Sequence, residues 1–187
     1  MSINLSDKFG KGITPRQFID GMTKNKDDFI DWYNRFEWPS EDDKTFFESL
    51  RGRELRCFIL MADWCGDAVR NIPVVLRALE AGDIPAEVLV MEQHLDTMDQ
   101  FLTFGGRSIP IVIFVDAGGE VLGKWGPRPE YVQEPMVLFK QSNPDREAAD
   151  YEAKLAETRQ EIMRRYGEGT AYHPLVIAEL RKLLQSI

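Results

Sequence analysis

Short apolar segments alternate with amphipathic segments between residues 55 and 125, and their order leaves few architectures open. Residues 55–62 form a nearly continuous apolar run, which is typical of a strand covered on both faces. Apolar residues then recur at helical spacing as far as Gly82. Further segments follow in the order strand, helix, strand, strand, at residues 87–91, 96–104, 109–115 and 120–125. This order predicts an α/β fold.

The segments on either side of this region are predicted to be helical. Helices are expected after Thr14-Pro15, around Phe29 and after Ser40, and then over residues 131–140, 145–166 and 175–187. With 187 residues, of which 43% are hydrophobic, the chain can bury one core of ordinary size. We therefore expect a single domain in three parts, which are a helical extension (1–53), a core (54–140) and C-terminal helices (141–187).

Charge and composition exclude several classes of protein. The 23 basic and 31 acidic residues give a net charge of −8, which would repel a nucleic-acid backbone. No apolar run approaches the roughly 20 residues of a membrane span, and residues 1–11 lack the pattern of a secretory signal, so a cytoplasmic location is expected. His94 and His173 stand far from any ligand-spaced cluster, and we expect both to be ordinary surface or loop residues. Neither a metal nor a cofactor is predicted.

Two cysteines, Cys57 and Cys65, are too few for a disulfide scaffold. Cys57 lies within the first predicted strand and is expected to be a small core residue. Cys65 lies where that strand leads into a helix, and the unpaired N–H groups of a first helical turn favour a thiolate. Asp63 and Asp67 oppose this effect, while Arg70 could compensate for them, so the direction of the net pKa shift stays open.

The residues around Cys65 carry a resemblance. The run Trp64-Cys65-Gly66-Asp67-Ala68, preceded by a central strand, and the run Ser108-Ile109-Pro110, followed by an apolar strand, resemble the thioredoxin family. The flanking helices are similar to those of bacterial thioredoxin-like proteins with a Trp-Cys-Gly-Asp-Cys motif. The resemblance implies a thioredoxin-like fold, with a mixed four-stranded sheet flanked by helices and extra helices at both termini.

The resemblance also implies roles for these residues. Cys65 would be the nucleophile, Trp64 would shield one side of it, and backbone N–H groups near Gly66 and Asp67 would stabilise its thiolate. A cis peptide bond before Pro110 would shape the substrate site and leave the Ile109 backbone free to pair with an extended peptide.

Two departures from the family pattern limit this chemistry. Ala68 occupies the position of the second family cysteine, so a mixed disulfide on Cys65 would wait for an external thiol. A natural monothiol protein, a relative that only binds and an engineered Cys→Ala substitution all account for Ala68. The strand before the motif also lacks the family's buried acid, because Ile59 and its neighbours are apolar and Asp63 is the nearest carboxylate.

We therefore expect a thiol–disulfide oxidoreductase with impaired dithiol turnover, acting on a protein disulfide or with a small-molecule thiol. The alternative is a non-catalytic thioredoxin-like module that binds a protein partner. Aromatic residues at helical spacing are expected to be core residues, namely Trp32, Trp38, Phe46 and Phe47. Trp125 and Tyr131 flank the loop 126–129 and could border a substrate groove, and the charged helix 145–166 is interpreted as a solvated face.

Overall fold

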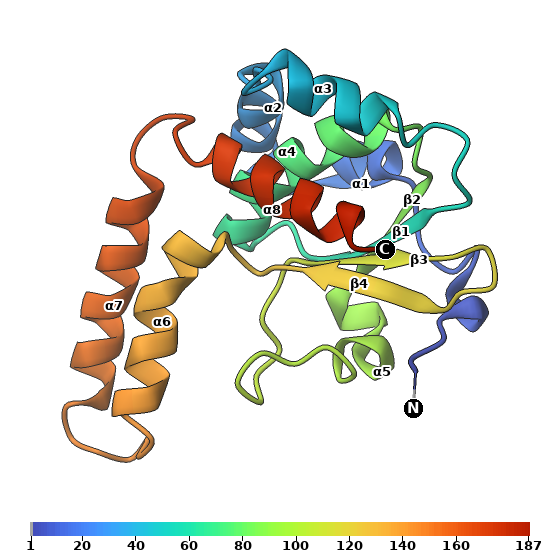
Figure 1. Ribbon diagram of the computed structural model, residues 1–187. Helices are drawn as coiled ribbons and strands as arrows, with labels where there is room; N and C mark the ends of the chain where they lie inside the picture. The colour runs from blue at the N-terminus through green and yellow to red at the C-terminus, as the bar shows by residue number, and fades with distance from the viewer. Residues whose placement is uncertain (1) are drawn as a thin grey trace.

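A mixed four-stranded sheet with the strand order β2-β1-β3-β4 lies at the centre of the computed structural model, which describes residues 2–187 (Figure 1). The central strand β1 (Arg56–Met61) pairs in parallel with β2 (Ala86–Val90). On its other side β1 pairs antiparallel with β3 (Ile111–Val115), which pairs antiparallel with β4 (Val121–Trp125). The predicted α/β class and mixed sheet are confirmed.

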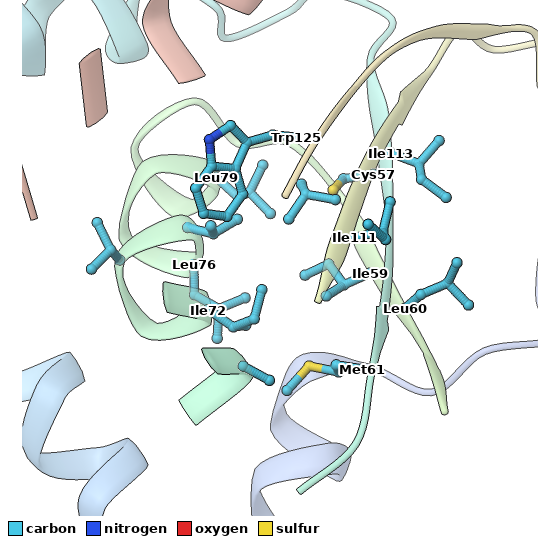
Figure 2. Packing of buried hydrophobic residues seen from close by; sticks show 14 of the residues in the cluster. Cys57, Ile59, Leu60, Met61, Ile72, Leu76, Leu79, Ile111, Ile113 and Trp125 are labelled. Atoms are coloured by element: carbon cyan, nitrogen blue, oxygen red, sulfur yellow. The ribbon is translucent and has the colours of Figure 1, made fainter. Parts of the chain in front are cut away.

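One face of the sheet packs on α4 (Gly66–Ala81) and α8 (His173–Gln185). Cys57 and Ile59 point from β1 toward α4, where Ile72, Leu76 and Leu79 form the facing layer (Figure 2). Leu60 and Ile113 point to the opposite face. Alternating side chains of the strands β1 and β3 are thus buried on both sides, which explains their continuous apolar sequence.

Helix α8 lies beside α4 and also contacts β4 (Figure 1). A Cβ atom at Gly123 of β4 would lie 2.7 Å from a methyl carbon of Leu183, so the glycine lets α8 approach the strand closely. The boundaries predicted for the three parts of the chain stay predictions. Because α8 returns to α4 and β4, we propose that it belongs with the core.

The N-terminal helices pack on the core, the first on β2 and the other two on α4. They are α1 (Pro15–Gly21), α2 (Lys26–Asn34) and α3 (Glu41–Glu48), preceded by the 3₁₀ turn η1 (Ser6–Lys8). Thr14 caps α1 by accepting a hydrogen bond from the Gln17 backbone N–H while the Gln17 side chain accepts one from the Thr14 N–H. Both α2 and α3 contact α4. Of the four aromatic residues predicted to be core residues, Phe47 is buried, whereas Trp32, Trp38 and Phe46 are only partly buried and pack against the core.

Helices α6 (Glu130–Ser142) and α7 (Tyr151–Tyr166) form a hairpin that stands apart from the remaining helices (Figure 1). The interpretation of residues 145–166 as one solvated helix is wrong in two respects. The helix begins only at Tyr151, and one side of it is buried, because Tyr151, Ile162 and Tyr166 are almost inaccessible. The hairpin is inserted between β4 and α8.

The region between β2 and β3 contains less helix than predicted. After the 3₁₀ turn η2 (Met91–Gln93), helix α5 spans only Leu95–Met98. The chain then turns at Phe104, whose φ is 51°, and Thr103 forms an isolated bridge with Gly106. Phe101 is buried without being helical, so the apolar spacing that predicted a helix as far as residue 104 reflects a packed loop.

The segment before α1 runs along both edges of the sheet. Asn4 forms an antiparallel bridge with Glu120, the residue before β4, and Ile13 forms one with Val88 of β2. A Cβ atom at Gly12 would lie 2.8 Å from the Val88 carbonyl oxygen, so glycine permits this close approach. Part of each edge strand is thereby paired.

The prediction that both histidines are ordinary surface or loop residues is wrong for His173. His173 is 2% exposed, and neither of its ring nitrogens has a hydrogen-bond partner within residues 2–187. Three aromatic rings surround it, those of Trp32, Phe36 and Tyr172. Burial, followed by the charges of Arg35 and Arg70, lowers the pKa of His173 to about 4. His94 lies in a loop but is also largely buried.

Candidate active site around Cys65

Cys65 occupies the N-cap position of α4, directly after the loop that follows β1. Its Sγ atom lies 3.4 Å from the carbonyl oxygen of Ile109, and the Ile109–Pro110 peptide bond is cis. The fold thus brings together the two segments that carry the family resemblance, which are 44 residues apart in the sequence. Only 8% of Cys65 is exposed, so most of the residue is shielded from solvent.

The surroundings of Cys65 raise its pKa above the usual value for a thiol. Burial is the largest cause, and the Asp67 carboxylate acts in the same direction. The backbone N–H groups of Ala68 and Asp67 and the positive charge of Arg128 oppose them by favouring the thiolate. Burial therefore outweighs the helix N-terminus, and the thiol form predominates at neutral pH.

Asp67 is held by a network that its local sequence does not predict. Two nitrogens of Arg128 donate to its two carboxylate oxygens, each at 2.8 Å, and the Tyr166 hydroxyl donates to Oδ1 at 2.8 Å. Asn71 donates to the Tyr166 oxygen at 2.7 Å and to the Asp67 carbonyl at 2.9 Å. Arg128 and Tyr166 lie 61 and 99 residues from Asp67 in the sequence, and no local pattern marks them.

Arg70, the candidate cation for offsetting the acidic neighbours of Cys65, is directed elsewhere. Its guanidinium lies over the rings of Trp32 and Tyr166 and donates to the Gly167 carbonyl at 3.3 Å. The cation that pairs with Asp67 is Arg128 instead.

Trp64 and Asp63 precede the thiol and make contacts of different kinds. Trp64 is 49% exposed, and its indole N–H donates to Glu92 at 2.7 Å. Asp63 accepts hydrogen bonds from the backbone N–H groups of Thr23 and Lys24, and although burial opposes them, these bonds lower its pKa. Asp63 therefore ties the motif to the N-terminal extension as an ionised group.

A cavity of about 320 Å³ borders Trp64. It lies between α1 and the ends of β1 and β2, and its lining includes Phe18, Met22, Ala62, Val90 and Glu92.

The remaining predicted site residues lie as follows. Ala68 is fully buried in the first turn of α4, Gly66 is exposed, and Pro110 is buried next to Ile109. A Cβ atom at Gly66 would meet no heavy atom within 4 Å, so the space above this turn is open.

Two other sequence interpretations have clear outcomes. Cys57 is 2% exposed and burial raises its pKa, so it is a core residue, as predicted. Trp125 does not border a surface groove. It is 6% exposed, packs on the α4 side of the sheet and donates its indole N–H to Glu179 at 3.1 Å. Tyr131 is 49% exposed, with the Arg165 guanidinium 4.8 Å from its ring centre.

Neither a membrane-spanning helix nor a metal-binding cluster occurs among the described residues. Between residues 2 and 187 no helix combines the length and apolarity that crossing a membrane requires. Over the same residues, no group of three or more His, Cys, Asp or Glu side chains is arranged to hold a metal ion.

Comparison with known proteins gives the family. A family model described as Thioredoxin matches residues 12–152, which is most of the chain. A solved structure of a protein of unknown function from Pseudomonas aeruginosa has 16% sequence identity and a TM-score of 0.67, with 98% of each chain covered. A solved HIV epitope-scaffold has 16% identity and a TM-score of 0.68, with 99% of each chain covered. No curated protein is similar enough to count as a relative.

At 16% identity the two solved structures support the fold alone. The family model covers the central strand, the Cys65 turn, the segment with Pro110 and the last two strands of the sheet. The chain therefore belongs to the thioredoxin family.

Proposed function

We propose that the protein carries out thiol–disulfide exchange through Cys65 and depends on an external thiol to complete each cycle. One observation carries this proposal. The Cys65 sulfur lies 3.4 Å from the Ile109 carbonyl, and the position three residues after the cysteine is a fully buried alanine. The Ile109 carbonyl is close enough to the sulfur that a peptide paired with this segment would bring its disulfide to Cys65.

The exchange has two steps. Cys65 first loses its proton to solvent, and the thiolate attacks one sulfur of a substrate disulfide. A bond forms between Cys65 Sγ and that sulfur, while the second substrate sulfur leaves as a thiolate. An external thiolate then attacks the substrate sulfur of the mixed disulfide, which releases the Cys65 thiolate and forms a new disulfide with the substrate.

The raised pKa of Cys65 sets the expected rate. Because only the thiolate reacts, a buried thiol attacks slowly at neutral pH and faster as the pH rises. The N–H groups of Asp67 and Ala68 would stabilise the same sulfur as it becomes charged.

Mixed-disulfide trapping tests the proposal. The reduced protein is incubated with oxidised glutathione, and the intact mass is followed. Wild type should accumulate one glutathione adduct at Cys65, and C65S should form none. In A68C the introduced thiol should attack the Cys65 sulfur and release glutathione, so the adduct should disappear. The product should contain an internal disulfide and be two hydrogens lighter than the reduced variant. Failure of wild type to form the Cys65 adduct at any pH up to about 9, near the ordinary pKa of a thiol, would refute the proposal.

A second candidate is a non-catalytic protein-binding module, which is favoured by the 8% exposure and raised pKa of Cys65. For a binding module, C65S should capture the same protein partners as wild type in an affinity experiment. Loss of all capture in C65S would instead favour covalent exchange.

A further inference from the structure

The Asp67 side chain places a negative charge in the same helical turn as the reactive sulfur. A carboxylate beside a thiol disfavours the thiolate, and the repulsion between the two negative charges grows where solvent is excluded. The Asp67 and Arg128 side chains are only 18% and 17% exposed, so water screens their charges weakly. An unpaired Asp67 would oppose the chemistry proposed for Cys65.

Arg128 is oriented to weaken this opposition. Its Nε and one terminal nitrogen bind both carboxylate oxygens at 2.8 Å, which is the paired geometry that a guanidinium makes best. Its other terminal nitrogen donates to Gln133 of α6 at 2.6 Å, so all three nitrogens of the guanidinium form hydrogen bonds.

Close packing of the loop that carries Arg128 also restricts its backbone position. Arg128 lies in the loop between β4 and α6, two residues after Gly126. Gly126 has a φ of 120°, and a Cβ atom there would lie 2.2 Å from the Pro110 carbonyl oxygen. The loop is thus packed against the segment that faces Cys65, and the α6–α7 hairpin starts from it (Figure 1).

We infer that Arg128 is a positioning residue that neutralises Asp67 beside the Cys65 sulfur, while Tyr166 of the α6–α7 hairpin fixes the carboxylate in place. This inference rests on the proposed function for its biological meaning. The Tyr166 hydroxyl holds Oδ1, and Asn71 in turn holds the hydroxyl, so the carboxylate is fixed from three elements, namely α4, the loop after β4 and α7.

The pH dependence of Cys65 alkylation by iodoacetamide tests the inference, with peptide mass spectrometry locating the modified cysteine. R128Q keeps a polar side chain but leaves Asp67 unneutralised, so its alkylation near neutral pH should be slower by about threefold or more, with the midpoint at higher pH. D67N leaves Arg128 unneutralised, so its alkylation should be faster by a similar factor, with the midpoint at lower pH.

The double variant separates charge from structure. R128Q/D67N removes both charges and should return close to the wild-type midpoint. If Arg128 served only to hold the loop, the alkylation midpoint of the double variant would differ from wild type as much as that of R128Q. The matched control is R107Q, which breaks an exposed paired contact to Asp99 of the same geometry and should leave the midpoint unchanged.

Equal midpoints in wild type and R128Q, or a double variant that behaves like R128Q, would overturn the inference. Alkylation reports the ionisation of Cys65 whether or not the protein exchanges disulfides. A failure of the glutathione experiment and a failure of this one are therefore distinguishable.

Discussion

Replacing His173 with phenylalanine tests how a buried histidine links folding to pH. The ring lies among aromatic side chains with both nitrogens unpartnered, and its pKa is lowered to about 4. In the unfolded chain the pKa returns to about 6.5. Between these two values the unfolded state binds more protons than the folded state, so protonation of His173 favours unfolding.

The magnitude follows from the two pKa values. The contribution of His173 to stability is complete above about pH 6.5 and is lost as the pH falls toward about 4. Linkage between protonation and folding lowers the free energy of unfolding by about 2 kcal/mol at about pH 5. The decrease reaches about 3 kcal/mol once His173 is fully protonated. Other titratable groups also contribute to the pH dependence of unfolding, so the quantity to compare is the difference in the free energy of unfolding between wild type and H173F.

Urea unfolding at about pH 7.5, 6 and 5 measures this difference. At the highest pH H173F should lie within about 1.5 kcal/mol of wild type, because an aromatic ring of similar size fills the site. At the lowest pH the free energy of unfolding of H173F, taken relative to wild type, should be about 2 kcal/mol higher than at the highest pH. H94Q is the control, and it should lose stability at low pH as wild type does, because it retains His173. A difference between H173F and wild type that stays constant over the whole range would refute the reasoning.

Three further substitutions test contacts that hold the site and the fold, each by urea unfolding against wild type. G126A should cost more than about 3 kcal/mol, because its Cβ would meet a backbone oxygen at 2.2 Å and its φ of 120° suits only glycine; a cost below about 1 kcal/mol would contradict this. Y166F should cost about 1–3 kcal/mol, because it removes a buried hydroxyl that donates to Asp67 and accepts from Asn71; an unchanged midpoint would argue against that network. T14A should cost about 1 kcal/mol through loss of the α1 cap, whereas T158A, within α7 and away from any cap, should cost less.

The four strands along the chain and the position of Cys65 could be predicted because both depend on neighbouring residues. A buried strand reads as an apolar run, and the Cys65 turn is one contiguous segment. The segment with Pro110 was identified in the same way, since it directly precedes the apolar strand β3.

The partners of Asp67 could not be predicted, because they come from distant segments. Arg128 follows β4 and Tyr166 ends α7, and neither position differs in the sequence from an ordinary loop arginine or helix tyrosine. The burial of His173 was missed for a related reason. It depends on Trp32 of α2 and on Phe36 just after that helix, which lie more than a hundred positions away.

The segment before α1 bears on how the protein avoids self-association. An unpaired strand edge is a template on which a second molecule can add a strand, and natural proteins cover or interrupt such edges. Here one short stretch pairs along both edges of the sheet, at Asn4 with the residue before β4 and at Ile13 with β2. Proteolytic removal of this stretch would uncover both edges at once, so the trimmed protein should aggregate by edge-to-edge strand addition even while Cys65 stays intact.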